Sequence, residues 1–156
     1  MNISKEAAVE EFVESMGLVA ESDGLPRIAG RIMGLMIIEG GPCSFSELAE
    51  RLEVSRASIS TNTRFLERVG VVSRVTLRGE RQDYFQLATA PYARLLQGSI
   101  DRMAKAHAVV TDAKSKLTLI DEAASRRLDE LAAFYEELGN SFQSLAKSLI
   151  SKTDPE

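Results

Sequence analysis

The feature that most constrains this chain is a change of hydrophobic period near Gly70. Before this glycine, two short segments have apolar residues three or four positions apart, as in helices with one buried face. After it, residues 71–77 and 82–87 are rich in β-branched and aromatic side chains and are separated by residues 78–81, which predicts a β-hairpin. Two short helices followed by a two-stranded ribbon is the order of a winged helix-turn-helix.

Capping residues indicate where the two helices begin and end. Ser44 precedes Glu47 by three positions, the spacing of a capping box, and predicts a helix over residues 45–52. Ser55 is the candidate N-cap of the next helix, which Gly70 ends. The inner face predicted for this second helix consists of Ile59, Thr63, Leu66 and Val69.

The opposite face of the second helix carries the candidate DNA contacts. Short hydroxyl side chains allow close approach to DNA, and a guanidinium can donate to guanine or phosphate. We predict that the residues entering the major groove are Arg56, Ser58, Ser60, Thr61 and Arg64. Asn62 lies near the boundary of the core, so the spacing leaves its role open.

The hairpin supplies a second candidate contact. Arg78 and Arg81 flank Gly79 at the predicted tip, from which an arginine can enter a minor groove or contact phosphate. Arg74, on the first strand, is predicted to pair with a backbone phosphate. The tip and the second helix together would contact two neighbouring parts of one DNA duplex.

Positive charge is confined to this central segment. The whole chain has a formal net charge of −4 at pH 7. Residues 51–82, however, contain seven arginines against three glutamates, which gives +4, whereas residues 1–50 carry −6 and residues 83–156 carry −2. A basic segment in an acidic chain indicates a polyanionic partner, and the guanidinium suits phosphates and guanine edges better than an ammonium does.

Longer helical patterns flank the central segment. Residues 4–21 predict an amphipathic helix with Ala8, Phe12, Met16 and Val19 on one stripe, and a second helix extends from about Pro26 to Glu39. From Pro91 onward, an apolar stripe continues to residue 149, with a predicted break near Thr118–Asp121, where Asp121 would cap the last helix. The predicted organisation is an N-terminal helix for dimer contact (1–24), a winged helix-turn-helix (25–90), a helical dimerisation region (91–150) and a frayed tail (151–156).

The flanking helices have more apolar surface than one small domain can cover. We therefore predict a homodimer, which also suits an operator with two half-sites. The predicted interface consists of Phe12, Met16, Leu128, Leu131, Tyr135, Leu138, Phe142 and Leu145. The alternative is a bundle within one chain.

Several classes of protein are excluded or disfavoured. With one cysteine and one histidine, the chain cannot form an internal disulfide or a Cys/His zinc site, and we expect no catalytic residues, metal or cofactor. No apolar run reaches the roughly 18 residues of a membrane span, and the N-terminus lacks a secretion signal, so a cytoplasmic location is expected. Cys43 is either an oxidant sensor or a buried structural thiol.

Four segments resemble, in order and spacing, the GbsR-like branch of the MarR transcriptional regulators: PRIAGRIMGLM (26–36), SELA (46–49), VSRASIS (54–60) and LERVGVV (66–72). The resemblance covers roughly residues 10–100. It implies a dimeric bacterial or archaeal regulator, often a repressor, with some relatives that respond to choline or other osmolyte-related ligands. The wing departs from the broader MarR pattern, because Gly79-Glu80-Arg81 stands where Asp-x-Arg is usual.

These observations predict a mainly α fold with a small β-hairpin wing, flanked by N- and C-terminal dimerisation helices. The expected function is sequence-specific binding of double-stranded operator DNA by a homodimeric, ligand-responsive repressor. An unidentified small-molecule effector would bind between the DNA-binding lobes and the dimer helices, where aromatic faces such as those of Phe12, Tyr92, Phe134 and Tyr135 could hold a quaternary ammonium. The alternative is a winged-helix protein-interaction subunit that does not read DNA.

Overall fold

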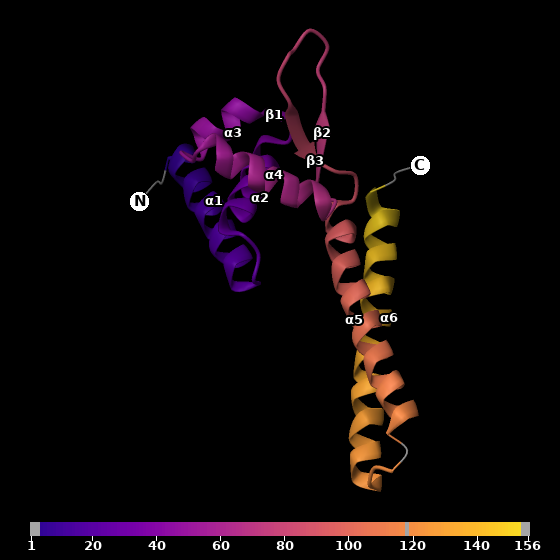
Figure 1. Cartoon of the computed structure of the whole chain (residues 1–156). Helices are drawn as coiled ribbons and strands as arrows, with labels where there is room; N and C mark the ends of the chain where they lie inside the picture. Colours follow the sequence, from indigo (N-terminus) through magenta and orange to yellow (C-terminus); the bar gives the residue numbers. More distant parts are fainter. Residues whose placement is uncertain (1–3, 118, 154–156) are drawn as a thin grey trace. The chain divides into compact units, whose positions relative to one another are not determined.

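The structure, a computed structural model, describes residues 4–117 and 119–153 and is mainly helical (Figure 1). The chain divides into two compact units, Met1–Pro91 and Tyr92–Glu156. The first unit contains α1 (Lys5–Ser22), α2 (Arg27–Glu39), β1 (Cys43–Ser44), α3 (Phe45–Arg51), α4 (Arg56–Arg68), β2 (Val72–Val75) and β3 (Tyr84–Leu87). The second unit consists of α6 (Glu122–Thr153) and nearly all of α5 (Pro91–Lys116).

The core of the first unit confirms the predicted winged helix-turn-helix. Helices α2, α3 and α4 and the small sheet contribute large side chains that have almost no solvent exposure. The largest fully buried side chains are Phe85, Ile32, Met36, Leu48, Leu52, Ile59, Leu66, Val71 and Thr63. Because α2, α3, α4 and β3 all contribute to this set, the unit has a core of its own.

The sheet has three antiparallel strands in the order β1-β3-β2, one more strand than the predicted hairpin. Cys43 lies opposite Phe85 in β3, and Arg74 of β2 lies opposite the same phenylalanine on the other side. Strand β1 is only two residues long, too short to have a hydrophobic period that sequence reasoning could detect. Strands β2 and β3 are also shorter than predicted, and residues 76–83 form a loop that projects beyond the sheet (Figure 1).

Helices α1 and α2 contact each other through small residues, and the face that α1 buries within this chain differs from its predicted apolar stripe. Its buried residues are Val13, Gly17 and Ala20, whereas Ala8 is exposed and Val19 is 52% exposed. The reason is close helix approach: a Cβ atom added to Gly30 of α2 would lie 2.5 Å from the Ala20 Cβ atom, and it would also meet the Met16 carbonyl oxygen. Small side chains were outside the apolar pattern on which the prediction depended.

The helix ends in this unit follow the predicted caps. The Ser44 hydroxyl accepts a hydrogen bond from the Glu47 amide at 3.1 Å, and the Glu47 carboxylate accepts one from the Ser44 amide at 2.7 Å, which completes the capping box. Gly40 ends α2 in the left-handed region (φ 69°), a conformation that glycine adopts without steric cost. Pro26 occupies the N-cap position of α2.

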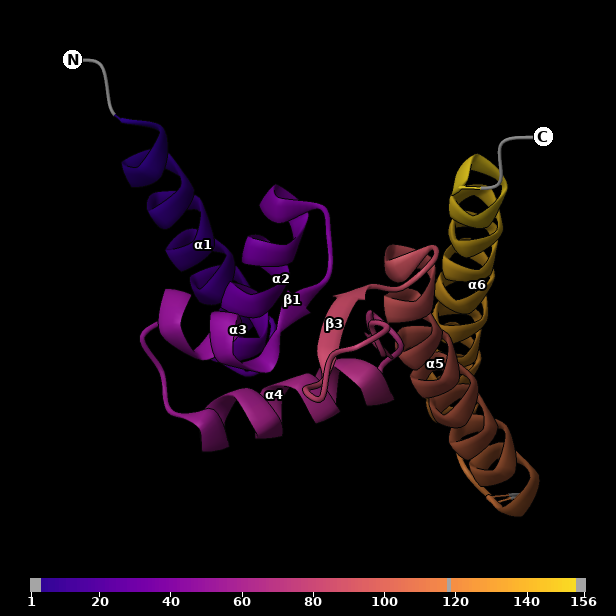
Figure 2. The same cartoon turned by 90° about the horizontal axis from the view of Figure 1, so that it is seen from above.

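Helices α5 and α6 lie side by side in both views (Figures 1 and 2). The predicted break between them is confirmed, and the Asp121 carboxylate accepts a hydrogen bond from the Ala124 amide at 2.6 Å. Thr118, which the prediction included in the break, lies outside the described residues. An ion pair between Lys114 and Asp129 joins the two helices near this turn.

Two predicted boundaries need correction. The tail predicted from residue 151 begins later, because α6 continues to Thr153, where the Thr153 hydroxyl donates to the Leu149 carbonyl at 2.8 Å. Residues 154–156 lie outside the described residues. Helix α1, predicted as a separate segment (1–24), belongs to the same compact unit as the winged helix-turn-helix, which does not test whether it also contacts a second copy. Among the described residues, no helix combines the length and apolar character needed to cross a membrane.

Candidate nucleic-acid interface

Helix α4 is anchored by a buried inner face. Ser55 caps its first turn by accepting a hydrogen bond from the Ser58 amide at 3.1 Å. Ile59 and Leu66 are almost completely buried, and so is Thr63, whose hydroxyl donates to the Ile59 carbonyl at 2.8 Å. The fourth residue predicted for this face, Val69, is half-buried at the C-cap.

The outer face of α4 bears the predicted DNA contacts, and α4 runs along the edge of the first unit when seen from above (Figure 2). Arg56, Thr61 and Arg64 are exposed, whereas Ser58 and Ser60 are half-buried. The two serines therefore lie nearer to the margin of this face than the other three residues do, and contact of all five with DNA stays a prediction.

Two of these arginines are held in place by neighbours. The Arg64 Nη2 atom donates to the Ser60 Oγ atom at 2.8 Å, one helical turn earlier. The Arg56 guanidinium carbon lies 5.2 Å from the centroid of the Phe45 ring in α3, within the range of a cation–π contact. Both arginines remain exposed, so these contacts orient the side chains while leaving them accessible.

The structure also places two residues of α4 that the sequence did not select as DNA contacts. Asn62, whose role the sequence left open, is 7% exposed, and its amide nitrogen donates to the Ser58 carbonyl at 2.8 Å. It therefore belongs to the inner face. Arg68, which sequence reasoning did not select, is exposed and lies four residues after Arg64, so the helical spacing alone could have identified it.

The wing tip is exposed and basic. Arg78 and Arg81 lie in the loop between β2 and β3, and Gly79 between them has a φ of 88° in the left-handed region. Within the part of the chain that the structure describes, neither arginine side chain has a hydrogen bond or ion pair. Both are therefore available to an external anion.

Arg74 differs from the other candidate contacts. Its guanidinium forms ion pairs with Glu67 of α4 and with Asp83 in the wing loop, at 3.3 and 3.1 Å. Hydrogen bonding and charge from Glu67 raise the pKa of Arg74 above its ordinary value. The phosphate contact stays a prediction, and the guanidinium is already paired with two carboxylates.

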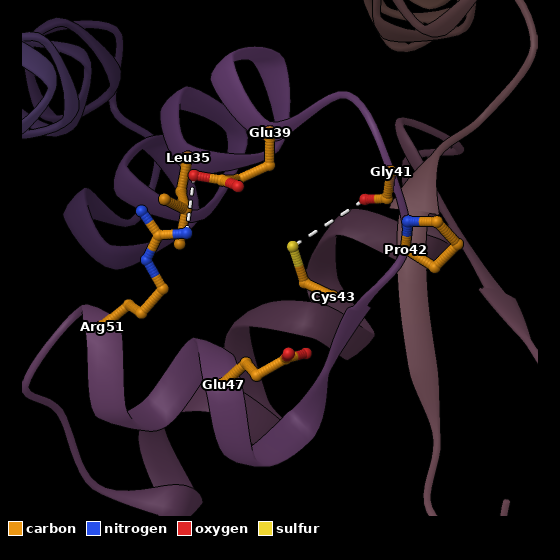
Figure 3. A pocket seen from close by; sticks show the side chains of 7 residues that line it. All are labelled: Leu35, Glu39, Gly41, Pro42, Cys43, Glu47 and Arg51. Atoms are coloured by element: carbon orange, nitrogen blue, oxygen red, sulfur yellow. Dashed lines mark hydrogen bonds and ion pairs between the residues drawn. The ribbon is translucent and has the colours of Figure 1, made fainter.

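Two cavities open on the first unit. The smaller, of about 220 Å³, is lined in part by Cys43, Glu39 and Arg51, and the latter two form an ion pair at 2.5 Å (Figure 3). Burial raises the pKa of the Cys43 thiol, and the carboxylates of Glu47 and Glu39 raise it further. A thiol that resists ionisation is a poor nucleophile, which favours the structural interpretation of Cys43.

The larger cavity, of about 660 Å³, lies along α1, α2 and the end of α3. Its buried apolar lining includes Val13, Leu35 and Leu52. Arg31 crosses this region, with its Nε atom 2.6 Å from the Glu14 carboxylate and its Nη2 atom donating to the Leu52 carbonyl at 3.0 Å. Among the described residues, no three His, Cys, Asp or Glu side chains are grouped as a metal ion would require.

The residues predicted for the dimer interface are incompletely covered by their own chain. Those that are half-buried are Phe12, Met16, Leu128, Tyr135, Leu138 and Phe142. Leu131 and Leu145 are 40% and 49% exposed. The interface itself remains a prediction.

Known proteins resemble this chain both in sequence and in fold. Residues 30–74 match the model described as "Bacterial regulatory protein, arsR family". The HTH-type transcriptional regulator MmpR5 of Mycobacterium tuberculosis (strain ATCC 25618 / H37Rv) is 35% identical over 127 residues, which cover 81% of this chain and 77% of that protein. The putative HTH-type transcriptional regulator YvaV of Bacillus subtilis (strain 168) is 24% identical over 82 residues, 53% of this chain and 46% of that protein.

A crystal structure of a transcriptional regulator superposes with a TM-score of 0.75 and 31% identity, covering 90% of this chain and 97% of the other. The matched family model is that of the ArsR regulators, so the GbsR-like branch of the MarR family is not confirmed. The similarity to MmpR5 extends well beyond the matched helix-turn-helix. The chain therefore belongs to the family of HTH-type transcriptional regulators that includes MmpR5, and its winged helix-turn-helix is a DNA-binding domain.

Proposed function

We propose that this regulator is a homodimeric repressor that reads its operator with α4 in the major groove and with the wing tip on the adjacent minor groove or backbone. The proposed helix contacts are Arg56, Ser58, Ser60, Thr61 and Arg64, and the proposed wing contacts are Arg78 and Arg81. The observation that carries this proposal is the exposed basic face of α4, which is backed by a fully packed inner face. A rigid helix with accessible arginines has the form and charge that a major groove accepts.

The dimer is proposed because one helix-turn-helix covers only one half-site of an operator. Apolar side chains on α6 that are accessible in the single chain support a second copy as the partner, and we include Phe12 and Met16 of α1 in the same interface. Repression is favoured over activation because a dimer of two 17.1 kDa chains has little spare surface for recruiting polymerase.

A small-molecule effector, not identified, would control the DNA affinity of this repressor. Membership of the GbsR-like branch of the MarR family remains part of the proposal, since the segments between residues 26 and 72 support it. Thermodynamic linkage requires that such an effector lower operator affinity by the same factor as the operator lowers effector affinity.

Fluorescence anisotropy with labelled duplexes from the region upstream of the gene tests operator binding. Specific binding should weaken steeply with salt, with a slope in log–log coordinates of about −0.9 per phosphate neutralised. A duplex of scrambled sequence should bind more weakly at every salt concentration. Equal affinity for both duplexes would contradict sequence-specific reading, and no binding to either would favour the protein-interaction subunit.

Arg64→Ala separates base reading from phosphate binding. If Arg64 reads a base, the substitution should cost about 1–3 kcal/mol on the specific duplex and much less on the scrambled one. An equal loss on both would make Arg64 a phosphate contact. Arg126→Ala, which removes an exposed arginine of α6, is the matched control and should leave both affinities unchanged.

A further inference from the structure

Arg74 connects the recognition helix to the wing through two carboxylates. Its Nε and Nη2 atoms each donate to one oxygen of Glu67 at 3.3 Å, a bidentate arrangement with a residue of α4. Its Nη1 atom donates to the Asp83 Oδ2 atom at 3.1 Å, and Asp83 immediately precedes β3. One side chain of β2 thus joins the last turn of α4 to the base of the wing loop.

Aromatic contacts support the same connection. The Arg74 guanidinium carbon lies 5.5 Å from the centroid of the Phe85 ring, whose own exposure is 1%. That ring lies 6.5 Å from the ring of Phe45, and Phe45 in turn supports Arg56 near the start of α4. The Phe45 amide also donates to the Asp83 carbonyl at 3.1 Å. The sheet beneath the wing is therefore connected to both ends of α4, through Arg74 near the C-terminus of the helix and through Phe45 near its N-terminus.

The charge around Arg74 opposes a role in phosphate binding. Glu67 and Asp83 together carry two negative charges against its single positive charge, so an approaching phosphate would be repelled by the local group. Arg78 and Arg81, by contrast, form no ion pair within the described ranges, although Glu80 lies between them in the sequence. The arginines of the hairpin therefore fall into two kinds, one engaged inside the protein and two accessible at the tip.

From this geometry we infer that Arg74 is a positioning residue, which fixes the direction of the wing relative to α4 so that Arg78 and Arg81 meet DNA while α4 occupies the major groove. This inference rests on the DNA-binding mode proposed above and replaces the phosphate contact expected for Arg74. The loop of residues 76–83 is anchored at its base by the Arg74–Asp83 ion pair. Without that anchor, the tip would sample many directions and its contacts would carry an entropic cost.

The first test compares variants on the upstream duplex by anisotropy. Glu67→Gln removes the bidentate ion pair to α4 but keeps the charge of Arg74 and its ion pair with Asp83. We expect it to weaken specific binding by less than Arg74→Ala, which removes both ion pairs and should weaken binding about 5-fold. The double variant should bind no more weakly than Arg74→Ala alone, because Arg74→Ala already removes the contact with Glu67. If Arg74 were a phosphate contact, Glu67→Gln would leave affinity unchanged or raise it, which would overturn the inference.

The second test asks which DNA contacts depend on Arg74. Arg81→Ala should weaken binding in the wild type but much less in an Arg74→Ala background, because the wing is no longer directed at DNA. Arg64→Ala is the matched control, and its penalty should be the same in both backgrounds. A penalty for Arg81→Ala that persists unchanged in the Arg74→Ala background would overturn the inference, and a general folding defect would instead alter both penalties.

A measurement without DNA distinguishes failure of this inference from failure of the proposed binding mode. Amide hydrogen exchange in the free protein should become faster at Tyr84–Leu87 in both Arg74→Ala and Glu67→Gln, while the inner turns of α2 keep their protection. Unchanged exchange in the strands would overturn the inference even if DNA binding is specific. Faster exchange would support the positioning role even if no upstream duplex binds.

Discussion

The two units of this chain bury their apolar residues to very different extents. The first unit encloses Phe85, Met36 and several leucines and isoleucines almost completely. In the described residues of the second unit, the buried hydrophobic side chains are Ala93, Ile100, Val110 and Ala146, of which two are alanines. The larger apolar side chains that remain exposed there include Val109, Leu131, Phe134, Leu145 and Ile150. The first unit covers its large apolar side chains with its own core. The second unit leaves apolar surface that its own two helices do not cover.

The largest effect is expected from emptying the core of the first unit. Phe85→Ala removes a ring that is 1% exposed and should lower the free energy of unfolding by about 3–5 kcal/mol. Urea denaturation followed by circular dichroism measures this loss. Because the core lies within one chain, the loss should not depend on protein concentration, and a strong concentration dependence would contradict a self-contained core.

The second unit should respond to substitution through assembly. Leu131→Glu places a charge at a position that is 40% exposed in the single chain but predicted to be buried in the dimer, and it should weaken dimerisation by about 2–3 kcal/mol. Sedimentation equilibrium gives the dissociation constant. Ala133→Glu, on an exposed part of α6 outside the predicted stripe, is the control and should leave it unchanged. A wild-type chain that is monomeric at micromolar concentration would defeat the dimer proposal and favour the bundle within one chain.

A smaller effect is expected at the capping box of α3. Ser44→Ala removes the hydroxyl that accepts from the Glu47 amide and should cost about 1 kcal/mol in thermal or urea unfolding. The hydrogen bond from the Ser44 amide holds the pKa of Glu47 below its ordinary value. Since this pKa is lowered by folding, its stabilisation is present above the ordinary value of 4.5 and is lost as pH falls below it. As pH is lowered, the free energy of unfolding of Glu47→Gln should therefore fall less than that of the wild type.

The smallest effect is expected from Cys43 at alkaline pH. Folding raises the pKa of its thiol, so the stabilisation is fully present below the ordinary value of 9.0 and declines as pH rises above it. The difference in unfolding free energy between the wild type and Cys43→Ala should therefore shrink between pH 8 and pH 10. A difference that grows with pH would show that the thiolate is stabilised by the fold and would restore the oxidant-sensor hypothesis.

Much of the fold could be predicted because local signals coincided with tertiary contacts. The caps at Ser44 and Ser55, the glycine that ends α2 and the break before Asp121 all depend on residues a few positions apart. The inner face of α4 was predicted for the same reason, since its spacing repeats over several turns. Local patterns were sufficient wherever a single element determines its own boundaries.

The errors arose where the outcome depends on a distant partner. Strand β1 exists because Cys43 pairs with Phe85, 42 positions later in the chain, and two residues carry no period. The buried side of α1 depends on Gly30 of α2, where an added Cβ atom would meet Met16, Gly17 and Ala20. Likewise, the charge of Arg74 was visible in the sequence, but its partners Glu67 and Asp83 were identified only by the fold.

The small-residue contact between α1 and α2 also has a mechanical consequence. An interface lined by long side chains can absorb a displacement by changing rotamers, but Gly17, Gly30 and Ala20 have no rotamers to change. We therefore expect a shift of α1 to move α2 with little change at their interface. Helix α2 contributes Ile32 and Met36 to the same core in which α4 is packed. A displacement of α1 is therefore expected to be passed through α2 to the helix that carries Arg56 and Arg64.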